Sequence, residues 1–250
     1  MKKVLITGAT SGFGRACALY YAERGYYCIV TGRRTERLEE LSQDIESKFG
    51  KGKVEYLTHD VRDRESVFND LAKYDDLDIL VNNAGLALGL EPAYETNTDD
   101  WDTMVQTNIN GLIYCTRAIL PGMVKRKKGH IINIGSIAGT HPYPGANVYG
   151  ATKAFVRQFS LNLRSDLQGT NIRVTNVEPG MAESEFSIVR FKGNEDAAGK
   201  VYENTKPLTP QDIAEIVYWV SSVPEHVNIN AIEVMPTCQA WGPFSISRDE

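Results

Sequence analysis

The feature that most constrains the fold is the alternation of short apolar segments with longer amphipathic segments along all 250 residues. Several apolar segments lack a strict apolar–polar alternation, which is typical of strands buried on both faces of a parallel sheet. The pattern predicts the α/β class, with one doubly wound parallel sheet, right-handed crossovers and a single domain over residues 1–250. The predicted strands are residues 3–7, 27–32, 54–57, 78–85, 130–136, 172–180 and 231–235. The predicted helices are residues 12–25, 35–49, 63–74, 98–127, 148–168 and 210–222.

Residues with capping side chains mark the starts of several helices. Thr35, Asp63 and Thr98 stand at the start of amphipathic segments, and Thr209 precedes a proline suited to the first helical position. Residues 181–208 depart from the rhythm, because they are polar, contain glycine and are weakly periodic. A segment of that length between a strand and a helix is usually functional, so we expect a substrate lid there.

Composition narrows the class of partner. The net charge of −5 argues against nucleic acid or an anionic membrane as the main partner. No apolar run is long enough to span a bilayer, and the first one breaks at Thr7 and Gly8, short of a secretory leader. The cysteines show neither CxxC spacing nor a cluster with histidine, which predicts no metal site, no disulfide framework and a reducing, cytoplasmic location. We expect all of them to be small buried residues: Cys17, Cys28, Cys115 and Cys238.

A glycine-rich turn, "TGATSGFG" at residues 7–14, follows the first predicted strand. Glycine there lets the backbone turn sharply and approach a pyrophosphate at the start of the next helix. In this βαβ context the motif predicts the dinucleotide site of a Rossmann fold. The residues expected to form it are Gly8, Thr10, Ser11, Gly12, Phe13 and Gly14.

The end of the second strand indicates which dinucleotide binds. An NAD site places a carboxylate there for the ribose hydroxyls, whereas this chain has Arg33 and Arg34. Arginines bind a phosphate bidentately, and the hydroxyls of Thr10 and Ser11 could add hydrogen bonds to it. NADP is therefore the expected cofactor, with a surface turn capped by two arginines as the alternative.

Tyr149 and Lys153 are four residues apart at the start of a predicted helix, so both side chains leave the same face. An ammonium beside a phenol favours the phenolate, which would make the tyrosine an acid/base near neutral pH. The alternative is a structural pair, a half-buried tyrosine and a solvated lysine.

Taken in order, these motifs resemble the short-chain dehydrogenase/reductase family over essentially the whole chain. The matching residues are Thr7-Gly8-(x)3-Gly12-Phe13-Gly14, Asn82-Asn83-Ala84-Gly85, Asn108-x-x-Gly111, Ser136, Tyr149-x-x-x-Lys153 and Pro179-Gly180. The resemblance implies an NADP-dependent oxidoreductase whose helices at 98–127 and 148–168 pack against a neighbouring subunit in a homotetramer. Aromatic residues on these segments are expected in the core or at that interface: Trp101, Tyr114 and Phe159.

The resemblance also implies a role for each site residue. Tyr149 is the general acid/base, Lys153 lowers its pKa and binds the nicotinamide ribose, Ser136 holds the substrate oxygen, and Asn108 anchors a water that relays protons. The implied cofactor contacts are Asp60 and Val61 to adenine, Asn83 to the adenosine ribose, and Pro179, Gly180 and Ser184 to the nicotinamide end.

A narrower similarity, carried by segments such as "TGRRTERLEEL" and "EFSIVRFKGN", is to the NADP-dependent 3-hydroxy acid dehydrogenases. It implies a small 3-hydroxy acid or 3-oxo acid as substrate, such as L-serine, L-allo-threonine or 3-hydroxypropionate/malonic semialdehyde. A carboxylate substrate needs a cation, and Arg190 in the lid is the candidate, unless it pairs with Glu185 or Glu195. His141 and Tyr143 are expected to line the substrate pocket.

Two other functions stay open at this point. One is an NADPH-dependent reductase of neutral ketones, aldehydes or sugars, because the fold determines the hydride chemistry but not the substrate. The other is a non-catalytic NADP-sensing protein, which would have no use for an activated tyrosine. The C-terminal tail carries Trp241 and Phe244, which could reach either a neighbouring subunit or the active site.

Overall fold

The computed structural model describes residues 1–241, which form a seven-stranded parallel sheet in the order β3-β2-β1-β4-β5-β6-β7. The strands are β1 (Lys3–Ile6), β2 (Tyr27–Gly32), β3 (Val54–Thr58), β4 (Ile79–Asn82), β5 (Gly129–Ile134), β6 (Ile172–Pro179) and β7 (Ala231–Val234). The predicted fold class is confirmed. The fourth strand ends at Asn82, which leaves Asn83 and Gly85 in the loop that follows it.

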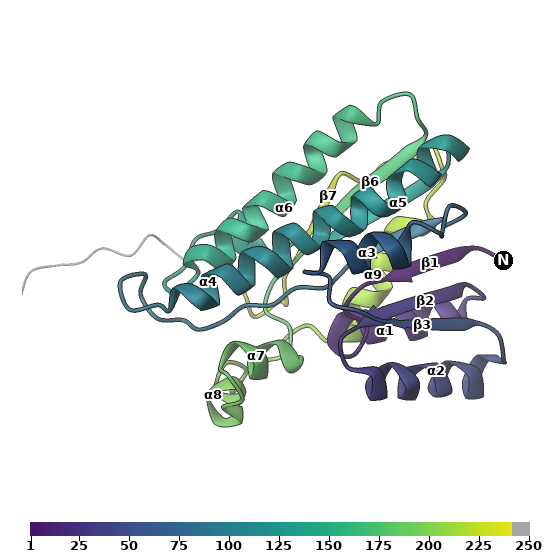
Figure 1. Ribbon diagram of the computed structural model, residues 1–250. Coiled ribbons are helices and arrows are strands. Elements are labelled where there is room, and N and C mark those ends of the chain that lie inside the picture. The colour runs from purple at the N-terminus through teal and green to yellow at the C-terminus, as the bar shows by residue number, and fades with distance from the viewer. Residues whose placement is uncertain (242–250) are drawn as a thin grey trace, which may run out of the picture.

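Helices cover both faces of the sheet (Figure 1). One face carries α1 (Gly12–Glu23), α2 (Thr35–Phe49) and α9 (Pro210–Ser222), and the other carries α3 (Arg64–Leu71), α5 (Leu112–Arg126) and α6 (Asn147–Asp166). Strand side chains alternate between the faces, so Val4 and Ile6 contribute to one core while Leu5 contributes to the other. Both cores exclude water, which explains why the buried inner strands lack a polar face, whereas the edge strands β3 and β7 are partly exposed and carry Glu55 and Glu233.

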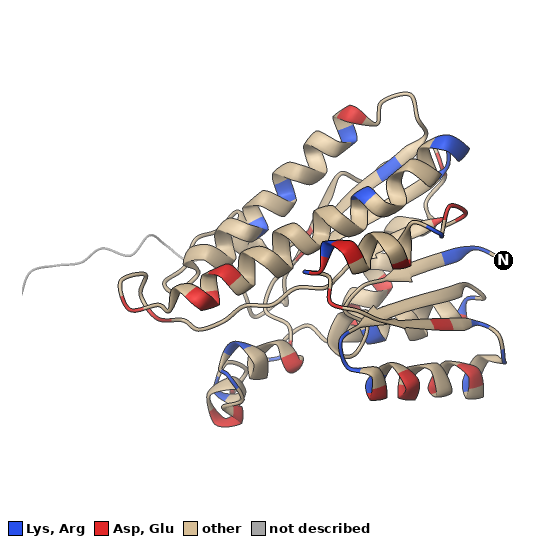
Figure 2. Ribbon diagram, viewed as in Figure 1, with Lys and Arg blue, Asp and Glu red and all other residues tan. Residues whose placement is uncertain are grey.

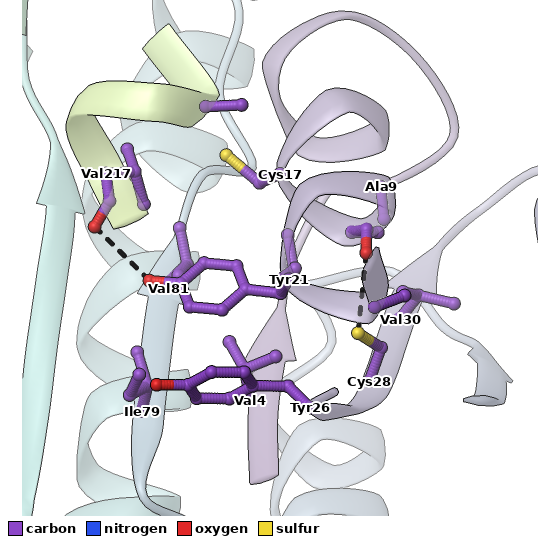
Figure 3. Packing of buried hydrophobic residues seen from close by; sticks show 14 of the residues in the cluster. Val4, Ala9, Cys17, Tyr21, Tyr26, Cys28, Val30, Ile79, Val81 and Val217 are labelled. Carbon is purple, nitrogen blue, oxygen red and sulfur yellow. Dashed lines mark hydrogen bonds between the residues drawn. The ribbon is translucent and has the colours of Figure 1, made fainter. Parts of the chain in front are cut away.

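Tyr21 ties two helices together within the first core. Its ring is fully buried, and its hydroxyl donates to the Val217 carbonyl oxygen at 3.2 Å (Figure 3) and lies 2.9 Å from Ser221 Oγ. A buried phenol without such a partner would be costly, so these bonds let a large aromatic side chain fill the space between α1 and α9. The packing places α1, and with it the glycine turn, at a defined position over the sheet.

The capping residues in the structure match those predicted from the sequence at two helices and differ from them at two others. Asp63 accepts from Ser66 N at 3.1 Å, and Thr209 forms a reciprocal capping box with Asp212. Asn97 rather than Thr98 caps α4 (Thr98–Val105), because the Asn97 amide oxygen reaches Asp99 N at 2.9 Å. Helix α2 has Arg34 in the cap position without a side-chain cap, because a guanidinium carries only donors and cannot accept from the helix N–H groups.

Two segments hold structure that periodicity did not indicate. The predicted helix 98–127 is interrupted by a π-helical segment (Gln106–Gly111) between α4 and α5. The predicted lid segment contains α7 (Glu185–Arg190) and α8 (Glu195–Lys200), which stand apart from the layers that cover the sheet (Figure 1). Residues 1–241 contain no helix with the length and apolar character to cross a membrane.

The cysteine prediction holds for three positions and is wrong for the fourth. Cys17, Cys28 and Cys115 are buried, whereas Cys238 is exposed. Cys238 follows the last strand of the sheet, where no helix layer covers it, so a residue type usually buried lies at the surface. Of the two aromatic residues of the tail, Trp241 is described and Phe244 lies outside the described residues.

Candidate active site

The candidate site is a cleft at the carboxyl ends of the strands. The sheet order reverses direction between β1 and β4, and ligands of doubly wound sheets bind at such a switch point. A cleft of about 650 Å³ lies there, lined by the glycine turn, the ends of β4, β5 and β6, the start of α6, and the lid. Of the predicted site residues, all but Gly14 and Asn108 line it.

The glycine turn has the geometry that a pyrophosphate needs. Gly8 has a φ of +66°, and a Cβ there would lie 2.8 Å from Ala84 Cα. A Cβ on Gly14 would lie 2.4 Å from the Gly8 carbonyl oxygen. Side chains at these positions would disrupt the turn, so the backbone itself faces the cleft at the start of α1. The turn therefore fits a dinucleotide.

Asn83 and Thr7 brace this turn. The Asn83 side-chain amide donates to the carbonyl oxygens of Thr7 and Gly8 at 2.9 and 3.1 Å. The Thr7 hydroxyl accepts from Asn83 N and Ala84 N, both at 3.0 Å. Asn83 thus holds the turn as well as lining the cleft. Thr7 has a positioning role that the motif alone did not indicate.

Arg34 lies against the same turn. Its guanidinium donates to Thr10 Oγ1 at 2.8 Å and to Ser11 Oγ at 3.0 Å, so these hydroxyls hold the arginine. Another nitrogen of the guanidinium, Nη1, lies 3.2 Å from Glu185 Oε2 in the lid. Arg33 is exposed and forms no ion pair among residues 1–241. The predicted arginines therefore do more than cap a surface turn, because both line the cleft.

Arg37 joins this cluster and was missed by the sequence analysis. It stands one helical turn after Arg34 and pairs with the same Glu185 carboxylate. Arg37 lies three residues after Arg34, within the predicted helix 35–49. That spacing was the signal that could have found it. Nearby, Asp60 is held bidentately by Arg62, with Nη2 to Oδ2 at 2.6 Å. Partial burial opposes ionisation of Asp60, but hydrogen bonds from Arg62 hold its pKa below the ordinary value.

Tyr149 and Lys153 lie one turn apart on α6, and both are buried. The alternative of a half-buried tyrosine and a solvated lysine is therefore wrong. Lys153 Nζ donates to the Ile134 carbonyl oxygen at 2.8 Å, and burial lowers its pKa to about 8. A buried ammonium with so little compensation is costly, which is typical of functional lysines.

The pKa of Tyr149 is raised to about 12 in the chain alone. Burial is the main cause, and the neighbouring Tyr143 adds to it, while the Ser136 hydroxyl and the charge of Arg190 lower the value. The predicted effect of Lys153 on this pKa stays a prediction, since the ammonium is engaged with the Ile134 carbonyl. Ser136 lies two residues after the end of β5, and its hydroxyl accepts from Ala138 N at 3.1 Å.

Asn108 lies behind the cleft, in the π-helical segment. Its amide donates to the Leu86 carbonyl oxygen at 2.8 Å and to Thr152 Oγ1 at 3.0 Å, and its oxygen accepts from Leu86 N at 2.9 Å. Thr152 in turn donates to the Tyr149 carbonyl oxygen at 2.8 Å. The extra residue per turn of the π-helix brings Asn108 toward α6, and this bulge is typical of functional sites.

Arg190 projects from the lid over Tyr149. Its Nε donates to the Gly89 carbonyl oxygen at 3.1 Å, and its guanidinium lies 5.4 and 5.6 Å from the ring centroids of Tyr143 and Tyr149. Within the part of the chain that the structure describes, Nη2 is buried without a hydrogen-bond partner. The predicted alternative, an ion pair with Glu185 or Glu195, is wrong: Glu185 pairs with Arg34 and Arg37, and Arg190 forms no ion pair among residues 1–241.

The remaining walls of the substrate end come from several segments. His141 and Tyr143 line the cleft as predicted. Gln239 and Trp241, beyond the last strand, line it too; Gln239 Oε1 accepts from Met181 N at 2.7 Å. These described residues of the tail therefore line the candidate site of their own chain. Trp101, Tyr114 and Phe159 pack against the cores, as expected.

Comparisons with known proteins agree with this geometry. The family model described as short chain dehydrogenase matches residues 2–195. An NADP-dependent 3-hydroxy acid dehydrogenase of Salmonella typhi is 55% identical over 250 residues, covering 98% of this chain and 99% of that protein. Sulfoacetaldehyde reductase 2 of Chromohalobacter salexigens is 50% identical over 251 residues, covering 98% of both. The solved closed form of serine dehydrogenase complexed with NADP+ shares 53% identity at a TM-score of 0.94, covering 99% of this chain and 100% of that one.

Proposed function

The chain belongs to the short-chain dehydrogenase family, and we propose that it transfers hydride between NADP(H) and a small 3-hydroxy acid or the matching 3-oxo acid. One observation carries the substrate class. Arg190 presents a buried guanidinium nitrogen without a partner among the described residues, beside the tyrosine that would exchange the proton. A substrate carboxylate would satisfy that donor.

The cofactor is NADP. The turn that starts at Gly8 would receive the pyrophosphate, and Arg33 and Arg34 would bind the 2′-phosphate. When bound, the nicotinamide supplies the hydride for reduction or accepts it in oxidation. We assign the adenosine contacts to Asp60, Val61 and Asn83, and the nicotinamide contacts to Pro179, Gly180 and Ser184; all of these residues line the cleft.

Tyr149 moves the proton. In reduction its hydroxyl gives a proton to the carbonyl oxygen, and in oxidation the phenolate takes the proton of the alcohol. Ser136 would hold the same substrate oxygen, since it lines the cleft with Tyr149 and its hydroxyl lowers the pKa of that tyrosine. Lys153 would bring a positive charge to the ribose end of the site, and Asn108 would lead protons from it to solvent through a bound water.

The named relatives support an anionic aldehyde or alcohol as substrate. A 3-oxo acid such as malonic semialdehyde carries a carboxylate one methylene from its carbonyl, and sulfoacetaldehyde carries a sulfonate at the same place. Arg190 beside Tyr149 suits both, because one cation would hold the anion while the tyrosine reaches the carbonyl oxygen. We place the 3-hydroxy acids first, on the more similar relative.

We further propose a single domain over residues 1–250, a homotetramer and a cytoplasmic location. The tetramer is supported by exposed apolar side chains on the helices expected to meet a neighbouring subunit. These are Val105 of α4, Val124 of α5 and Leu161 of α6.

The test is a substrate panel followed by the absorbance of reduced nicotinamide. L-Serine, L-allo-threonine, 3-hydroxypropionate and a neutral secondary alcohol are each offered with NADP and with NAD. Turnover of the hydroxy acids with NADP alone is expected, and turnover confined to the neutral alcohol would reject the anionic substrate. Tyr149→Phe should lower turnover by about 10²–10⁴-fold and keep NADP binding. A sensor protein would show no turnover to lose.

A further inference from the structure

Glu185 connects the lid to the arginines of the cofactor site. The carboxylate lies at the first residue of α7, and both of its oxygens are engaged, one by Arg34 and the other by Arg37. The facing ends of α7 and α2 carry acidic and basic residues, respectively (Figure 2). An acidic side chain from the lid therefore holds two cations at the end of the second strand, where a 2′-phosphate would be recognised.

The cluster has a surplus of positive charge that suits a second anion. Arg33, Arg34 and Arg37 supply three positive charges and Glu185 removes one, while Arg33 has no ion pair in the described part of the chain. Partial burial opposes the ionisation of Glu185, but hydrogen bonds from Arg37 and Arg34 keep its pKa below the ordinary value. The carboxylate is therefore charged at neutral pH and occupies donors that a phosphate would use.

We propose that Glu185 is a cofactor-affinity residue that competes with the 2′-phosphate of NADP for Arg34 and Arg37, and that Arg37 belongs to the 2′-phosphate site. This inference rests on the proposed use of NADP. A phosphate carries more charge than a carboxylate and binds guanidinium more strongly, so NADP wins the competition. The carboxylate remains close enough to weaken binding and to take the arginines back when NADP leaves.

The opposite effect would be that Glu185 strengthens NADP binding by fastening the lid. The exposure of the ion-paired side chains to water disfavours it. The side chains of Arg34, Arg37 and Glu185 are 42%, 41% and 38% exposed. Ion pairs so accessible to water contribute little to holding two segments together. The repulsion between Glu185 and a phosphate on the same arginine is screened to the same degree, but it acts on twice the charge.

Equilibrium binding to the full chain tests the proposal, with NADP+, NAD+ and 2′,5′-ADP as probes and protein fluorescence or calorimetry as the readout. We expect Glu185→Gln to tighten NADP+ and 2′,5′-ADP by about three- to tenfold and to leave NAD+ unchanged. Arg37→Gln should weaken the same two probes and spare NAD+. Glu183→Gln is the matched control, because this exposed neighbour forms no ion pair among residues 1–241.

The outcomes separate this inference from the proposed function. Weaker or unchanged NADP+ binding by Glu185→Gln would overturn the competition, as would equal tightening of NAD+ or the same effect from Glu183→Gln. Each of those results leaves the NADP preference of the wild-type chain intact. A wild-type chain that binds NAD+ as tightly as NADP+ would instead overturn the proposed cofactor and this inference with it.

Discussion

Asn108 and Thr152 are joined by a hydrogen bond of 3.0 Å that crosses from the π-helical segment to α6, the helix that carries Tyr149. The Thr152 hydroxyl donates a hydrogen bond to the Tyr149 carbonyl oxygen, and Thr152 is 1% exposed. The pair therefore sets the position of Asn108 relative to the residue that is to exchange the proton. Thr152 is a positioning residue in this arrangement.

Replacing Thr152 should separate positioning from packing. Thr152→Val keeps the shape but removes both hydrogen bonds, so we expect kcat to fall by about ten- to a hundredfold with little change in the KM for NADP. Thr152→Ser keeps the hydroxyl and should recover most of the rate. Steady-state kinetics over pH are the measurement. A purely structural role would lower the melting temperature of the Val variant and leave its pH profile unmoved.

The pKa of Tyr149 predicts opposite pH behaviour in the two directions. Because the phenol is protonated far above neutral pH in the chain alone, it is ready to donate in reduction, which should be flat near neutral pH. Oxidation needs the phenolate, so kcat/KM should rise by about tenfold per pH unit below the apparent pKa. A bound positive nicotinamide should move that pKa down. An oxidation rate independent of pH would contradict the assignment of Tyr149.

Ser136 offers an independent check of the same group. The nearby Ser136 hydroxyl lowers the pKa of Tyr149, so Ser136→Ala should move the alkaline limb of the oxidation profile to higher pH. The expected displacement is about one pH unit, as for one hydrogen bond to a charged group. Initial rates of oxidation across the alkaline range measure it. Lower activity with an unmoved profile would mean that Ser136 acts on the substrate alone.

Arg190 should discriminate substrates by charge. Arg190→Met fills a similar volume without the charge, and we expect the KM for 3-hydroxy acids to rise by about ten- to a hundredfold while that for a neutral alcohol changes little. Arg190→Lys should retain part of the effect, since it keeps the charge and loses the planar fork. The comparison is made by steady-state kinetics on both substrate classes. Equal damage to both would show that the residue serves lid packing only.

The capping box at the start of α9 predicts a stability effect away from the site. Thr209→Ala removes the acceptor for Asp212 N and should cost about 1 kcal/mol, a decrease in Tm of about 2–4 °C for a domain of this size. Thr209→Ser keeps the cap and is the control. Calorimetric melting of both variants measures the effect; equal melting temperatures for Ala and Ser would show that the box contributes nothing.

Sequence patterns alone predicted most of the site residues that line the cleft. The residues that follow β1, β2, β4 and β5 include Gly8, Arg34, Asn83 and Ser136, and all of them line it. That success has a physical reason: parallel strands end at a common edge, so residues placed just after each strand converge whatever connects them. The spacing of Tyr149 and Lys153 is likewise local, because one helical turn sets it.

What the sequence by itself determined is therefore the parallel sheet, the glycine turn and the placement of Tyr149 and Lys153 on one helix face, since each depends on local periodicity or on the common edge of the strands. Only the tertiary structure decided which charges meet. Glu185 lies about as near Arg190 in the sequence as any acidic residue of the lid, yet it pairs with Arg34 and Arg37 across the cleft. Burial likewise set the pKa directions of Tyr149 and Lys153. Ion pairing and desolvation depend on segments far apart in the chain, and no local pattern records them.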